Sequence, residues 1–279
     1  MLFYTNMLTS PTRSSQVETS KFTVEFDPSG RLLSVGDKKV EQSWGFYTSF
    51  DADRTELGAT PQPQGDYLAW TPGVPGTCLP GYLDAEGDEE RWLRDSDGQN
   101  SGAYIFRPSK KDEKLTDLAP QAGRVKVVET DLVTEVTAEF GEWVKQITRV
   151  GKDSNYVEIE WTVGPVPTDD NVGKEVVMKF STDIKNSGTF YTDSNGREFL
   201  ERKLDFRPTW DMEVFQPVAG NYYPVNAAIY IEDSESSISV LNDRTQGGAS
   251  LADGEVRGAR SEATAKTDSK KYYTSFLHN

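Results

Sequence analysis

The sequence has very few of the residues that enzymes most often use for covalent and metal chemistry. Its 279 residues include one cysteine, Cys78, which cannot form an internal disulfide and has no second thiolate to share a zinc ion. The single histidine, His278, is the penultimate residue, so a Ser/His/Asp or Cys/His arrangement would require the chain end to fold back. We therefore expect no metal site and no histidine-based catalytic site in this chain.

Long apolar runs and positive charge are also scarce. No apolar run approaches the ~20 residues that span a bilayer, and residues 1–15 contain no apolar stretch typical of a signal peptide. The 30 lysine and arginine residues are outnumbered by 45 aspartate and glutamate residues, which leaves a net charge of −15. This charge repels phosphate backbones and anionic lipid headgroups. We expect neither nucleic acid nor a membrane as a partner, and the sequence by itself leaves the compartment open.

The chain does contain many short runs in which apolar and polar residues alternate with period two. In residues 132–140 and 156–163 the apolar side chains fall on one face and the polar side chains on the other, as in half-buried antiparallel strands. No segment has the apolar stripe of a long helix. Similar runs occur at residues 22–26, 31–35, 44–50, 125–130, 143–150, 175–180, 226–231 and 237–241. The pattern predicts an all-β fold with a sandwich or barrel-like architecture.

Three segments lack this alternation. Residues 51–99 are rich in proline, glycine and acidic residues, so we expect a long irregular insertion there. Residues 1–20 are rich in serine and threonine and are expected to be irregular, and residues 255–279 are expected to form a disordered tail. The predicted organisation is therefore one β domain over residues 21–254, interrupted at 51–99.

The densest polar cluster is at residues 191–198, where Asp193, Asn195 and Arg197 could pair with sugar hydroxyl groups. The alternative, which we favour, is a β-turn whose charged residues pair across strands. Tyr222 and Tyr223 could stack on a sugar ring, but tyrosines in a strand-rich chain are more often core or edge residues. Residues 247–248 (GG) are expected to form a tight turn rather than a nucleotide site, because the lysine of a phosphate loop is absent.

Seven successive segments of the sequence together form a recognisable pattern. They are 101–108 (SGAYIFRP), 158–165 (EIEWTVGP), 173–176 (GKEV), 190–198 (FYTDSNGRE), 207–210 (RPTW), 217–226 (PVAGNYYPVN) and 241–248 (LNDRTQGG). In this order they resemble the lysosomal-type class II α-mannosidases of glycoside hydrolase family 38, in the β-rich region that follows the catalytic domain of that family. The similarity extends over residues 21–254, apart from the insertion, and ends where the family continues into an Asp-Arg-Arg segment.

The resemblance implies an antiparallel β-sandwich of the galactose mutarotase-like type. It implies an enzyme that hydrolyses terminal α-mannosides with an aspartate nucleophile and a zinc ion, both held by a catalytic domain that this sequence does not match. It also implies that Tyr104, in the Ser-Gly-Ala-Tyr turn, reaches the mannose pocket, the alternative being a buried strand tyrosine that alternates with Ile105. The compartment it implies is the lysosome or vacuole. We expect no cofactor in this chain, and we expect mannose-containing glycans and an α-mannosidase catalytic domain as partners.

Three interpretations follow from the resemblance. The first is a fragment or divergent paralogue of an α-mannosidase, which carries its carbohydrate-binding β domain and is inactive alone. The second is a stand-alone carbohydrate-binding or protein-interaction module without catalysis. The third is a partial enzyme that needs a separate catalytic chain.

Overall fold

The computed structural model describes residues 6–9, 14–48, 108, 114–121, 123–167, 169, 173–209, 211, 214, 217–261 and 270–278. The insertion predicted at residues 51–99, and Tyr104, lie outside the described part of the chain. Within that part, regular structure consists of strands and one short 3-10 turn, η3 (Ala219–Asn221). No helix among the described residues is long and apolar enough to cross a membrane.

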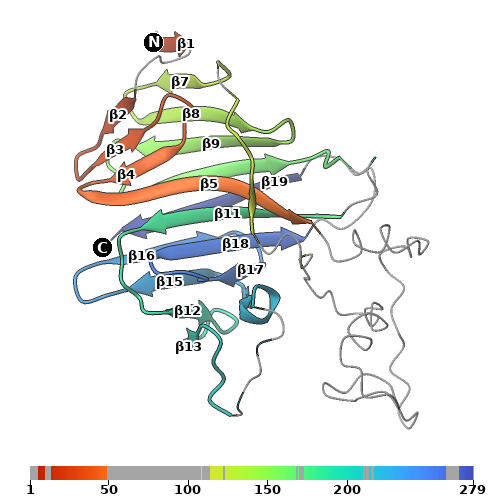
Figure 1. The fold of residues 1–279 in the computed structure, drawn as a ribbon. Coiled ribbons are helices and arrows are strands. Elements are labelled where there is room, and N and C mark those ends of the chain that lie inside the picture. The colour runs from red at the N-terminus through yellow and green to blue at the C-terminus, as the bar shows by residue number, and fades with distance from the viewer. Residues whose placement is uncertain are drawn as a thin grey trace.

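The strands form two antiparallel sheets that face each other (Figure 1). The ten-stranded sheet has the order β1 (Asn6–Thr9), β7 (Lys126–Glu129), β8 (Val133–Phe140), β9 (Val144–Gly151), β10 (Tyr156–Val163), β19 (Lys270–His278), β16 (Ser237–Asn242), β15 (Ala228–Glu232), β12 (Thr189–Asp193) and β13 (Phe199–Lys203). The nine-stranded sheet has the order β14 (Tyr223–Val225), β17 (Gln246–Ala249), β18 (Glu255–Ser261), β11 (Lys174–Thr182), β5 (Lys38–Thr48), β4 (Leu32–Val35), β3 (Thr23–Phe26) and β2 (Ser15–Glu18), and β6 (Thr116–Asp117) also pairs with β5.

The hydrophobic core lies between the two sheets. Period-two alternation directs the side chains on one face of each strand into this core. In β8, Val136, Ala138 and Phe140 are fully buried, and the residues between them are partly exposed. Trp44 of β5 meets Trp161 of β10 edge-on, with ring centroids 5.3 Å apart. One core cluster contains buried side chains from both sheets. The predicted all-β antiparallel sandwich is therefore confirmed.

A buried polar network crosses the core. The Trp44 indole Nε1 donates a hydrogen bond to Gln146 Oε1 at 2.7 Å, and Gln146 Nε2 donates to Gln42 Oε1 at 3.1 Å and to Thr148 Oγ1 at 2.9 Å. Gln146 and Thr148 lie on β9, whereas Trp44 and Gln42 lie on β5 of the other sheet. Because buried polar groups are costly without partners, this network favours one relative position of the sheets.

Both predicted irregular ends contain strands. Residues 1–20 include β1 and β2, and Val17 of β2 is buried. The expected disordered tail contains β18, between β17 and β11, and β19, between β10 and β16. These segments lack period-two patterns, so their strand conformation depends on hydrogen bonding to neighbouring strands rather than on local sequence.

The predicted tight turn at residues 247–248 is also wrong, because both glycines lie within strand β17. Glycine suits this strand because a Cβ atom on Gly248 would lie 2.5 Å from Val225 Cγ2. The close approach of β14 therefore explains a glycine that sequence alone suggests is a turn residue.

Candidate functional site

The predicted polar cluster forms the hairpin turn between β12 and β13. Asn195 and Gly196 have φ values of 53° and 68°, the left-handed conformation that both central residues of a type I′ turn require. The Arg197 N–H donates to the Ser194 carbonyl at 3.0 Å, and the Ser194 N–H donates to the Glu198 carbonyl at 2.7 Å. The Asn-Gly pair thus sets the turn that joins the last two strands of the ten-stranded sheet.

The Asp193 carboxylate is buried and accepts hydrogen bonds from four backbone N–H groups. Its Oδ2 accepts from Gly196 at 2.8 Å, and its Oδ1 accepts from Asn226 and Ala227 at 2.8 Å and from Ala228 at 3.1 Å. Burial opposes ionisation, but these four donors hold the pKa of Asp193 below its usual value. The carboxylate therefore joins the β12–β13 turn to the start of β15.

Asn195 and Arg197 lie on the exposed side of the same turn. Asn195 Oδ1 accepts a hydrogen bond from Asn226 Nδ2 at 2.7 Å, and Asn226 Oδ1 accepts from Thr245 Oγ1 at 2.9 Å. The three residues thus lie in or beside one turn, as their sequence positions imply, but the Asp193 carboxylate is buried against backbone N–H groups whereas Asn195 and Arg197 are exposed. Sugar binding by these three residues stays a prediction, as does the role of Tyr104.

The two adjacent tyrosines have different surroundings. The ring of Tyr223 packs edge-on against buried Phe190, with centroids 5.7 Å apart, and carries the guanidinium groups of Arg202 and Arg207 at 4.3 and 4.9 Å from its centre. Such contacts stabilise the cation over the aromatic face. Tyr222 instead packs against a small second core, with Tyr47 and Val177, on the outer side of the nine-stranded sheet.

This outer side also carries a buried charged group, the Arg257 cluster, formed by Tyr47, Tyr222, Glu255 and Arg257. Arg257 donates hydrogen bonds to the Tyr47 hydroxyl and to Glu255, and the Arg257 and Glu255 side chains are only 13% and 10% exposed. Burial opposes the charge of Arg257, but Glu255 raises the pKa of the guanidinium above its ordinary value. Burial also raises the pKa of Tyr47 and of Tyr222, so both hydroxyls remain protonated at neutral pH. The sequence analysis missed this cluster because Glu255 and Arg257 lie in the segment expected to be disordered.

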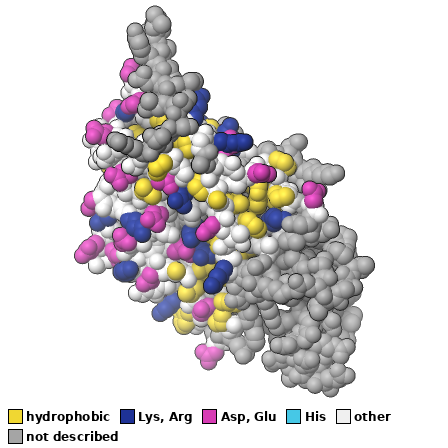
Figure 2. Space-filling view, turned by 45° about the horizontal axis from the view of Figure 1, so that its top comes forward, with side chains coloured by type: hydrophobic (Ala, Val, Ile, Leu, Met, Phe, Trp, Pro, Cys, Tyr) yellow, Lys and Arg dark blue, Asp and Glu magenta, His cyan; other side chains and the backbone are white. Residues whose placement is uncertain are grey.

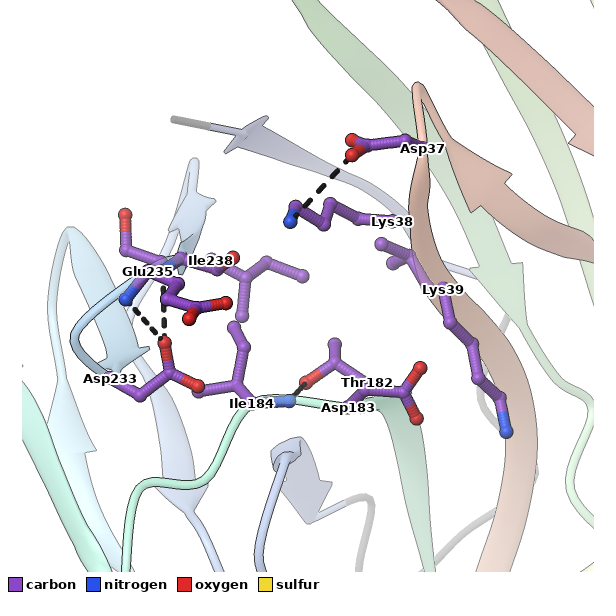
Figure 3. A pocket seen from close by; sticks show the side chains of 12 residues that line it. Asp37, Lys38, Lys39, Thr182, Asp183, Ile184, Asp233, Glu235 and Ile238 are labelled. Carbon is purple, nitrogen blue, oxygen red and sulfur yellow. Dashed lines mark hydrogen bonds and ion pairs between the residues drawn. The ribbon is translucent and has the colours of Figure 1, made fainter.

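A cleft of about 230 Å³ opens between the β4–β5 turn, the end of β11 and the β15–β16 turn (Figure 3). On one side of the cleft, Lys38 Nζ lies 3.7 Å from Asp37 Oδ2. On the opposite side, Asp233 Oδ1 accepts hydrogen bonds from the N–H groups of Glu235 and Ser236 at 2.8 and 2.9 Å. Backbone donors, chiefly Lys185 N–H, lower the pKa of Asp233, so its carboxylate serves as a turn acceptor.

Charges of both signs are distributed over the surface shown in Figure 2, with apolar side chains between them. No group of three or more histidine, cysteine, aspartate or glutamate side chains in the described residues could hold a metal ion.

Comparison with known proteins identifies the family of this chain. The model of the glycosyl hydrolases family 38 C-terminal domain matches residues 82–257, more than half of the chain. The chain belongs to glycosyl hydrolase family 38. The family 38 match includes the β12–β13 turn, Tyr222, Tyr223, and Glu255 and Arg257 of the Arg257 cluster, whereas Tyr47 of that cluster lies before the matched residues.

Several curated α-mannosidases are similar to this family 38 chain. An α-mannosidase of Arabidopsis thaliana is 50% identical over 162 residues, which are 58% of this chain and 16% of that protein. The α-mannosidase of Canavalia ensiformis is 46% identical over 189 residues, 68% of this chain and 18% of that protein. The lysosomal α-mannosidase of Homo sapiens is 48% identical over 170 residues, 59% of this chain and 16% of that protein. The chain thus spans less than a fifth of each of these relatives.

Among solved structures, an α-mannosidase from Enterococcus faecalis V583 aligns with 98% of this chain and 30% of that chain, at 11% sequence identity and a TM-score of 0.49.

Proposed function

We propose that this chain is the carbohydrate-binding β domain of an α-mannosidase that hydrolyses terminal α-mannosides in glycan catabolism. The observation that carries the proposal is the match of a C-terminal family 38 domain to residues 82–257. Relatives named α-mannosidases support it, because they share 46–50% identity with this chain while being several times longer. On this proposal the nucleophile and the zinc ligands come from residues outside this sequence, and the sandwich helps to shape the mannose site.

A hydrolysis assay tests the proposal. The purified chain should not release the aryl group from an aryl α-mannoside, with or without zinc, because on this proposal the nucleophile and the zinc ligands lie outside this sequence. Adding the separately produced catalytic portion of a relative should give turnover that exceeds the turnover of that portion alone. Zinc-dependent turnover by this chain alone, after rigorous removal of contaminating mannosidase, would contradict the proposal, as would a mixture without added turnover.

Tyr104 gives the proposal a residue-level test. In this chain joined to a catalytic portion, Tyr104→Phe should weaken mannoside binding by about 0.5 to 1.5 kcal/mol, the net contribution of one hydrogen bond, and should leave the melting temperature nearly unchanged. A lower melting temperature with unchanged affinity would show that Tyr104 is a packing residue.

A further inference from the structure

Three aromatic side chains gather on the outer face of the ten-stranded sheet, near the β13 edge; we name them the aromatic surface. They are Tyr191 of β12, Phe199 of β13 and Tyr230 of β15, three neighbouring strands at one end of the sheet (Figure 1). Tyr191 and Tyr230 are direct cross-strand partners whose rings stack with centroids 4.5 Å apart and an angle of 8°. Phe199 meets Tyr230 edge-on at 5.0 Å.

These three rings lie outside the hydrophobic core. The alternation of β12 and β15 turns Phe190, Ile229 and Ile231 into the core, where they are buried. Tyr191 and Tyr230 therefore point outward and remain partly exposed, and Phe199 on the edge strand is 47% exposed. On the side of Tyr230 away from Tyr191, its partner in β16 is Ser239, whose side chain is too small to cover an aromatic ring.

Carboxylates border the aromatic surface. Glu201 lies directly opposite Tyr191 on β13, and Glu232 follows Tyr230 by two residues on the same face of β15. Both glutamates are exposed. Burial and the nearby negative charges raise the pKa of Tyr191 and of Tyr230, consistent with carboxylates close to both rings.

This combination matches the chemistry of a neutral sugar. The C–H groups of a pyranose face carry slight positive charge and pack on the negative face of an aromatic ring. Carboxylates accept hydrogen bonds from the sugar hydroxyls around the rim. The two glutamates and the net charge of −15 disfavour anionic sugars at the same place.

We propose that the aromatic surface binds a neutral hexopyranose of a mannose-rich glycan, with Phe199 and Tyr230 packing on the ring and Glu201 and Glu232 accepting its hydroxyl groups. The choice of mannose rests on the proposed function. The site itself is separate from the Arg257 cluster, which lies on the other sheet.

Titration of the full chain with methyl α-mannoside and with a linear α-mannotriose tests this proposal, by calorimetry or by chemical-shift changes. We expect saturable binding, tighter for the trisaccharide. Phe199→Ala and Glu201→Gln should each weaken it at least fivefold. The matched control is Phe206→Ala, which removes another exposed ring, 51% exposed, that lies beyond the opposite end of β13. Its affinity should stay within twofold of the unmodified chain.

Glu201→Gln changes no packing, so the test does not depend on Phe199→Ala folding normally. Absence of saturable binding to either sugar, or equal binding by all variants, would overturn the proposal. Loss of sugar binding when the catalytic portion of a relative is added would also overturn it, because the surface would then be a domain contact. Turnover of that mixture is measured separately and tests the proposed function. The sugar-binding results test only the aromatic surface.

Discussion

At the scale of single residues, Asp193 gives a direct test of the hairpin site. Asp193→Asn removes the charge and turns an amide toward backbone donors, so it should lower the free energy of unfolding at pH 7 by about 2 kcal/mol. The folded-state pKa of Asp193 lies below its usual value, so its contribution is complete above the unfolded pKa of about 3.9 and is lost as pH falls through the folded pKa. Urea unfolding should therefore show the difference between the two proteins shrinking below about pH 4.

The control is Asp131→Asn, which changes an exposed aspartate and should alter the unfolding free energy by less than about 0.5 kcal/mol. A full-sized Asp193→Asn effect that persists at low pH would contradict the assignment to the ionised carboxylate. The sequence predicts the turn itself, because Asn195 and Gly196 are typical of it. It does not predict the partners of Asp193 in residues 226–228, because the fold brings that segment beside the turn.

At the scale of elements, β19 is the strand whose removal should matter most. It lies between β10 and β16 and pairs with Val157 and Ile159 of β10 and with Ile238 and Val240 of β16. Deleting residues 262–279 should leave two unpaired strand edges inside the sheet and expose those buried side chains. We expect the truncated chain to lose cooperative thermal unfolding, measured by circular dichroism, and to lose amide-exchange protection in β10 and β16.

Deleting residues 1–13 is the matched control, because it removes only the edge strand β1, which pairs with β7 alone in the described residues. If both deletions had equal, small effects, β19 would not be a central strand. Runs with regular alternation, such as β8 and β10, are predictable from sequence because burial of one face imposes the pattern. β18 and β19 are not, since neighbouring strands on both sides supply their hydrogen bonds whatever their local pattern.

At the scale of the whole molecule, the net charge of −15 sets how salt affects stability. Composition alone predicts the sign of this effect, because a large excess of one charge sign destabilises the compact state through self-repulsion. Attractive ion pairs oppose the repulsion, but those at the surface, such as Lys152 with Glu129 at 2.8 Å, each contribute only about 0 to 1 kcal/mol. Repulsion among the excess carboxylates should therefore be the larger long-range effect.

Raising sodium chloride from 10 to 150 mM should increase the melting temperature at pH 7.5 by about 3 °C. The electrostatic screening length shortens from about 30 to about 8 Å over this range, which weakens the repulsion. A gain of about 1 kcal/mol in the free energy of unfolding shifts the melting temperature of a domain of this size by a few degrees. The same scan at pH 5 is the control. There the chain is close to its isoelectric point of about 4.6, so the salt effect should nearly disappear. A melting temperature that falls with salt at pH 7.5 would mean that attractive pairs outweigh the repulsion. A rise of equal size at both pH values would assign the effect to salt acting on apolar surface instead.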